Sequence, residues 1–132
     1  MYKVLGIVKY DATRSVTLRD MNTSEIEECF DDSALVSQEN FNFIQIGELY
    51  DCKIKLFGKV VSEKNGRSVT CKVINREILV GKKVMTEVSM EGKRYYIAPN
   101  KLKKCWDEDV FNFSFTRKDL IQVNNVIHAD YL

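Results

Sequence analysis

The chain has 132 residues, the size of one domain with its own hydrophobic core. Its 45% hydrophobic and 30% charged residues, with a net charge of +1, exclude a disordered chain and argue against a generic polyanion binder. Because the apolar runs are too short to span a bilayer and the N-terminus lacks a signal-peptide pattern, we expect one globular domain over residues 1–132, cytoplasmic and without membrane contact.

Short segments of alternating polar and apolar residues recur along the chain, which is typical of strands rather than of long helices. Their spacing of about 8–12 residues, with turn signals between them, indicates an all-β barrel or sandwich. The expected strands lie at residues 2–9, 14–19, 41–46, 49–62, 68–75, 77–80, 83–90, 93–98, 110–116 and 120–127.

Two short helical segments interrupt this pattern. Ser24 and Glu27 have the spacing of a capping box, which predicts a short helix over residues 24–30, with a strand over the same residues as the alternative. Asn100 is a suitable cap for a turn of helix over residues 101–105.

Two dipeptides predict tight turns between neighbouring strands. Asn65-Gly66 is the stronger signal, because both central residues of a type I′ turn need a positive φ, and it joins the strands expected at 49–62 and 68–75. Glu91-Gly92 predicts a second hairpin further along the chain. We therefore expect a mainly β fold, a small antiparallel β-barrel or sandwich (OB-like or SH3-like) with one or two short helices.

The Asn65-Gly66 hairpin would have a core face and an outer face, since side chains alternate along a strand. Its pairing would place Lys59 opposite Lys72 and Lys55 opposite Arg76, and like charges in these positions destabilise a sheet. Stability alone therefore does not explain the outer face. Its residues, which we select as candidate nucleic-acid contacts, are Lys53, Lys55, Phe57, Lys59, Lys72, Ile74 and Arg76.

Positive charge around an exposed aromatic side chain suits a single-stranded nucleic acid. Basic side chains neutralise phosphates, and an aromatic face stacks on a base with about 1–3 kcal/mol. Residues 51–105 carry 14 basic and 5 acidic side chains, and the segments on either side are net acidic. The structural alternative is that exposed lysines deter edge pairing and cover Phe57 and Ile74, while acidic residues 20–39 or 107–109 lie across this face.

Other chemical signals are few. Cys29, Cys52, Cys71 and Cys105 are spaced too widely for a zinc site, and without a signal peptide we expect reduced thiols. Cys52 and Cys71 alternate with apolar neighbours, so we expect them to be buried. The one histidine, His128, has no nucleophile context, and we expect no catalytic residue, metal or cofactor.

These features favour a binding module, and a small hydrolase or other enzyme ranks lowest because the sequence offers no nucleophile–base set. The first hypothesis is contact with single-stranded nucleic acid through the basic face. The second is a protein–protein adaptor or inhibitor, for instance of a mobile element, acting through an exposed edge or through acidic residues 20–39. Salt-dependent binding of single strands favours the first, whereas a protein complex that survives nuclease treatment favours the second.

Overall fold

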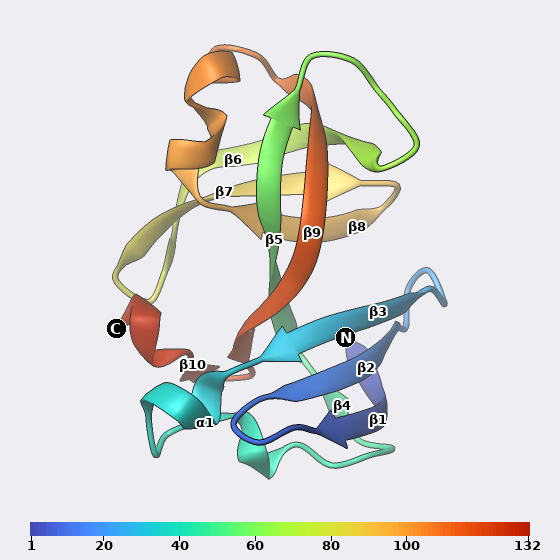
Figure 1. Cartoon of the computed structure of the whole chain (residues 1–132), viewed down its shortest axis with the longest axis vertical. Helices are drawn as coiled ribbons and strands as arrows, with labels where there is room; N and C mark the ends of the chain where they lie inside the picture. Colours follow the sequence, from blue (N-terminus) through green and yellow to red (C-terminus); the bar gives the residue numbers. More distant parts are fainter.

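The computed structural model describes all residues, 1–132, and consists mainly of strands (Figure 1). The strands are β1 (Tyr2–Lys9), β2 (Arg14–Asp20), β3 (Ile26–Asp31), β4 (Leu49–Tyr50), β5 (Cys52–Val61), β6 (Ser68–Val80), β7 (Lys83–Met90), β8 (Lys93–Ile97), β9 (Val110–Val123) and β10 (Val126–Ile127). The helical segments are α1 (Ser33–Val36) and the 3-10 turns η1 (Phe41–Phe43), η2 (Pro99–Cys105) and η3 (Ala129–Tyr131). None of the helices is long and apolar enough to cross a membrane.

Five strands close into a barrel, in the order β9-β5-β8-β7-β6 and back to β9. All neighbours in this ring are antiparallel except β5 and β8, which meet at a single parallel bridge between Lys55 and Tyr96. The turn η2 lies beside the barrel and connects β8 to β9 (Figure 1). This architecture confirms the predicted small antiparallel barrel with short helical segments.

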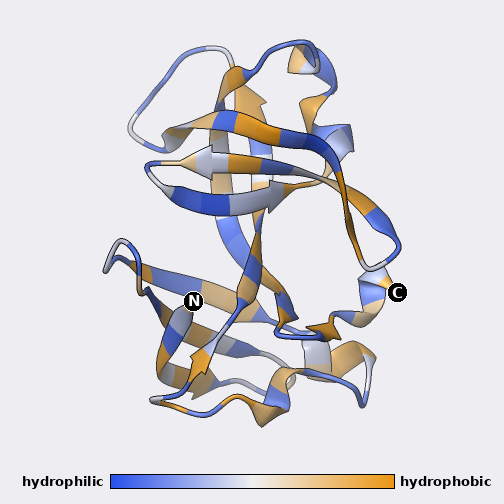
Figure 2. Ribbon diagram, turned by 180° about the vertical axis from the view of Figure 1, so that it is seen from behind, coloured by the Kyte–Doolittle hydropathy of each residue, from blue (hydrophilic) through white to orange (hydrophobic).

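The N-terminal residues form an antiparallel sheet of order β4-β1-β2-β3, which lies at the end of the barrel (Figure 2). This sheet joins β9 through one parallel bridge, between Phe30 and Asp119. The long strands β5 and β9 pair from Cys52–Val123 to Val61–Asn112 and pass from the N-terminal sheet into the barrel. The two parts of the fold are therefore connected through the same two strands.

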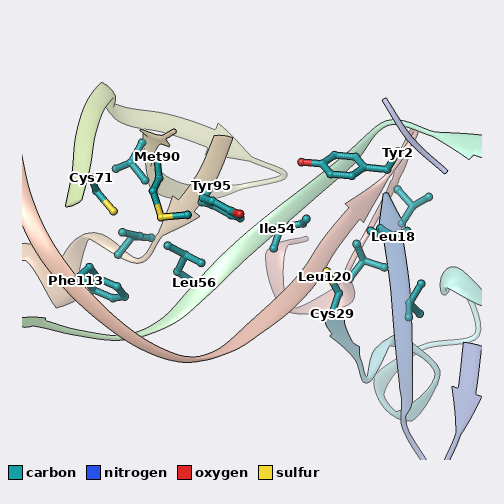
Figure 3. Packing of buried hydrophobic residues seen from close by; sticks show 14 of the residues in the cluster. Tyr2, Leu18, Cys29, Ile54, Leu56, Cys71, Met90, Tyr95, Phe113 and Leu120 are labelled. Atoms are coloured by element: carbon teal, nitrogen blue, oxygen red, sulfur yellow. The ribbon is translucent and has the colours of Figure 1, made fainter. Parts of the chain in front are cut away.

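The hydrophobic core runs without a break between these two parts. A cluster of 21 buried residues includes Leu18 and Cys29 in the N-terminal sheet and Leu56 and Phe113 in the barrel (Figure 3). A smaller cluster of five, around Tyr96, lies where the β6–β7 hairpin meets the C-terminal turn. Burial of apolar surface at about 25 cal/mol per Å² is the main stabilising contribution to such a core.

The predicted Asn65-Gly66 hairpin is wrong, because β9 lies between β5 and β6. Residues of β9 pair on one side with β5, as in Val60–Phe113, and on the other side with β6, as in Val69–Phe113. Neither Asn65 nor Gly66 has a positive φ. The Asn65 side chain instead accepts a hydrogen bond from the backbone N–H of Arg67, at 2.8 Å, so a local turn forms without joining paired strands.

The other local predictions have mixed outcomes. The Glu91-Gly92 hairpin is confirmed, and both residues have positive φ, 52° and 80°. The short helix over residues 24–30 is wrong, since this segment forms β3, the alternative interpretation. The strand expected at residues 41–46 is also wrong, because the Asn40 side chain caps the 3-10 turn η1 there.

Candidate nucleic-acid interface

The predicted alternation of side chains along β5 is confirmed. Ile54 and Leu56 are buried in the core, whereas the ring of Phe57 is 40% exposed. The pairing of β5 with β9 shifts between Phe57 and Gly58, and the additional residue, Thr116, lies on β9. Because the bulge is on β9, side chains along β5 continue to alternate between the core and the outer face. Lys55 and Lys59 therefore point outward with Phe57.

Three cationic groups lie close to the exposed ring of Phe57. Lys55 Nζ is 5.8 Å from the ring centroid, Lys101 Nζ is 5.3 Å away, and the guanidinium carbon of Arg117 is 4.9 Å away. Each such contact contributes about 0.5–1 kcal/mol at an exposed site. The three groups come from β5, η2 and β9, so the strand pairing and the η2 turn together assemble this positive surface.

Arg117 is the most firmly held of these cations. Its guanidinium lies close to two aromatic rings, those of Phe57 and Phe30, with the Phe30 centroid at 4.6 Å. It also donates two hydrogen bonds to Asp119, Nε to Oδ1 at 2.5 Å and Nη2 to Oδ2 at 3.1 Å. The hydrogen bond with Asp119 raises the pKa of the Arg117 guanidinium above its usual value. The planar group is therefore fixed beside Phe57 in its charged form.

A hollow lies on the barrel surface beyond Phe57, between the end of β5 and η2. Its volume is about 680 Å³, and its lining includes Lys59, Lys104, Glu108 and Asn112. Lys101 and Lys104 are three residues apart in η2, so a 3-10 turn places them on the same side. We refer to the following residues as the Phe57 face: Lys55, Phe57, Lys59, Lys101, Lys104 and Arg117.

The predicted site residues on β6 lie apart from the Phe57 face. Lys72 is opposite Val110 of β9 and Ser89 of β7, and the predicted contact of Lys59 with Lys72 does not form. Ile74, on the same strand, is exposed. Arg76 is neutralised, since its Nη2 lies 2.6 Å from Asp109 Oδ1. The segment 107–109 therefore pairs with one of the seven predicted residues.

The other predicted site residues, those on β5, have different neighbours from the ones expected. Lys55 lies opposite Asp119 of β9 rather than opposite Arg76, and Lys59 lies opposite Ser114. Lys53 Nζ lies 5.7 Å from the ring centroid of Tyr96. The predicted like-charge pairs across the strands are therefore wrong.

Most carboxylates of residues 20–39 are engaged within the N-terminal sheet and its junction with the barrel. Glu27 is buried, accepts a hydrogen bond from Tyr95 at 2.8 Å and lies 3.2 Å from Lys118 Nζ. The other engaged groups are Asp20 with backbone N–H groups, Glu25 with Lys93, Asp31 with Arg14, and Asp32 with His128. These acidic groups therefore do not lie across the Phe57 face.

Unlike most carboxylates of residues 20–39, most lysines of the barrel surface have no salt-bridge partner. No salt bridge forms at Lys53, Lys55, Lys59, Lys72, Lys101, Lys103 or Lys104. Unpaired lysines attract a phosphate backbone electrostatically, and salt screens this attraction over about 8–10 Å. The four lysines of the Phe57 face therefore carry unpaired positive charge, whereas its Arg117 is paired with Asp119.

The histidine and cysteine side chains serve the fold. His128 is buried, with Nε2 at 2.6 Å from Asp32 Oδ1, while its Nδ1 accepts a hydrogen bond from the Asp130 backbone N–H. Both ring nitrogens are thus occupied. The four cysteines are free thiols, and burial raises the pKa of Cys52 and Cys71 to about 12. Cys71 is buried as predicted, and Cys52 is partly buried.

Sequence reasoning missed three members of the Phe57 face: Lys101, Lys104 and Arg117. The first two follow Asn100 in a segment predicted to be a helical turn, but nothing local indicates which strand that turn covers. Arg117 depends on the β5–β9 pairing. Comparisons of the chain with family models, with curated proteins and with solved structures gave no match.

Proposed function

We propose that the protein is a non-enzymatic binding module that contacts single-stranded nucleic acid through the Phe57 face. The observation that carries this proposal is the exposed Phe57 ring with three cationic groups within 6 Å of its centroid. A base stacks on an aromatic ring whatever its identity, and neighbouring lysines neutralise phosphates on either side of it. Duplex DNA does not offer its base faces, so an exposed stacking ring favours a single strand.

The surface along β9 has a suitable length for a short strand of nucleic acid. The hollow beyond Phe57 reaches Val110 and Asn112, and the other end of the surface is at Lys118. Nine strand residues span about 26 Å at roughly 3.3 Å per residue. OB-type barrels bind single strands with site sizes from about four nucleotides upward, and the Phe57 face fits the lower end of that range.

A protein partner is the alternative function, and one observation favours it. Strand β4 pairs only with Tyr2 and Lys3 of β1, which leaves the outer edge of residues 5–9 without a strand partner. An open edge can accept a strand from another protein. The acidic segment is a weaker candidate for such contact, since Glu28 and Glu39 are its only carboxylates without a salt bridge or hydrogen bond.

Fluorescence anisotropy with labelled single-stranded oligonucleotides, titrated over a range of salt concentrations, tests the proposal. The double variant Lys55→Gln/Lys59→Gln should weaken binding and lower the salt slope by at most about 0.7 for each phosphate that is no longer neutralised. The charge-matched double variant Lys82→Gln/Lys83→Gln, with both lysines exposed and outside the lining of either hollow, should leave the slope nearly unchanged.

Phe57→Ala separates stacking from charge. It should weaken binding by roughly 5- to 150-fold, the equivalent of about 1–3 kcal/mol for one stacked base, and keep the salt slope of the wild type. Circular dichroism and thermal melting must first confirm that each variant is folded. If the folded wild type binds no oligonucleotide at low salt, the proposal is wrong, and a nuclease-resistant complex in a pull-down would then support the protein partner.

A further inference from the structure

A second depression adjoins the Phe57 face, where the N-terminal sheet and β9 diverge. Strands β3 and β9 pair only at Phe30–Asp119, so a groove of about 550 Å³ opens beside that bridge. Its walls include the aromatic rings of Phe30 and Phe115 and the bulge residue Thr116. A volume of this size is in the range of small-molecule sites, and aromatic walls suit a flat ligand.

Only one of the charged side chains that line this groove has no ion-pair partner. There are four, and three already have partners: Arg14 with Asp31, Arg117 with Asp119, and Lys118 with Glu27. The fourth, Glu28, is exposed and forms no salt bridge or side-chain hydrogen bond. A carboxylate left free beside cations that are bonded elsewhere is available to accept hydrogen bonds from a ligand.

The groove is continuous with the Phe57 face through one side chain. The guanidinium carbon of Arg117 lies 4.9 Å from the ring centroid of Phe57 and 4.6 Å from that of Phe30 in the groove wall. A strand with one base stacked on Phe57 therefore brings its neighbouring nucleotide to the mouth of the groove. Because the groove adjoins the Phe57 face, its expected occupant is a base of the same nucleic-acid strand.

We propose that the groove selects a guanine base, with the Glu28 carboxylate accepting hydrogen bonds from guanine N1–H and N2–H. This inference rests on the proposed function. A carboxylate only accepts, and guanine is the base whose Watson–Crick edge presents two donors side by side. Cytosine and adenine offer one amino group, and thymine and uracil place a single N–H between two carbonyl oxygens that repel a carboxylate. In a single strand this edge is free to be read.

Competition anisotropy with three oligonucleotide probes tests the selection of guanine. Each probe is a thymidine octamer, and its one central base is guanine, hypoxanthine or thymine; hypoxanthine keeps N1–H but lacks the N2 amino group. The wild type should bind the guanine probe about tenfold more tightly than the thymine probe, with hypoxanthine between them, since one good base contact discriminates by that order.

Two matched variants locate the selection. Glu28→Gln should bind all three probes within about twofold of one another, since its amide both donates and accepts. Glu39→Gln removes the other unpaired carboxylate of the same segment, away from the groove, and should keep the guanine preference.

The outcomes separate this inference from the proposed function. Equal binding of the three probes by the wild type, or an unchanged preference in Glu28→Gln, overturns the guanine site and leaves the Phe57 face intact as a stacking surface. Absence of binding to every probe overturns the proposed function, and the guanine site falls with it. A preference that disappears equally in Glu39→Gln would assign the effect to net charge and also contradict the inference.

Discussion

Among the six glycines, Gly58 is the one at which an added Cβ would come closest to another atom, which makes Gly58→Ala a sharp test of the β5–β9 pairing. A Cβ at this residue would lie 2.0 Å from the carbonyl oxygen of Ser114 and 2.6 Å from the Cα of Phe115. To reach an ordinary contact, the backbone of β9 must retreat by more than 1 Å. Both atoms belong to the backbone, so no rotation of a side chain can relieve the overlap.

The expected loss follows from that retreat. Overpacking in a core lowers stability by roughly 1–3 kcal/mol, and one or two broken ladder hydrogen bonds add about 1 kcal/mol each. We expect Gly58→Ala to lower the free energy of unfolding by about 2–5 kcal/mol and the melting temperature by roughly 10 °C. Urea denaturation and thermal melting followed by circular dichroism measure both quantities.

Gly66→Ala is the matched control, because nothing lies within 4 Å of a Cβ there and φ is not positive. This change should be neutral, or should stabilise by about 0.4–1 kcal/mol through the unfolded chain. A hairpin joining β5 directly to β6 through a type I′ turn predicts the reverse order, with Gly66 the sensitive position. Unaltered stability of Gly58→Ala, together with a large loss in Gly66→Ala, would refute the strand order described above.

Two further predictions concern buried ionisable groups. Glu27→Gln should lower the free energy of unfolding by roughly 3 kcal/mol, because Lys118, whose side chain is 16% exposed, loses its one carboxylate partner, while Lys93 keeps only Glu25. An unchanged urea midpoint would contradict this. Burial raises the pKa of Cys52 and Cys71 from about 9 to about 12, so in that pH range the unfolded chain releases protons that the folded protein keeps. Stability should be fully present below pH 9 and fall as the pH rises toward 12, more steeply than in a Cys52→Ala/Cys71→Ala variant, and a melting temperature independent of pH across this range would argue against it.

The sequence predicts the direction in which side chains point better than it predicts which strands pair. The alternation of Ile54, Leu56 and Phe57 is a local property of an extended backbone, and the structure confirms it. The Asn65-Gly66 signal is also local, but its outcome depends on whether another strand enters between its two neighbours. For Glu91-Gly92 no strand does so, and the same type of signal is correct.

The candidate site depends on both kinds of information. Lys55, Phe57 and Lys59 are spaced two residues apart on one strand, so the alternation of side chains is sufficient to place them on the same outward face. Arg117 and Lys101 reach Phe57 only through the closure of the barrel and the position of η2, and neither is readable from spacing along the chain. Closure by β9 is also what separates Lys72 from Lys59.

The position of β9 has a consequence for how the protein reaches its native state. The ribosome delivers β5 to β8 before the strand that lies between β5 and β6, so the edges of β5 and β6 that pair with β9 have no strand partner until β9 is inserted. Until then the apolar faces that carry Leu56 and Cys71 remain open to water. Pairing between segments so distant in sequence slows folding, and unpaired edges attract other chains in the meantime. Late insertion of a single strand is thus the step at which synthesis of this fold is most exposed to aggregation.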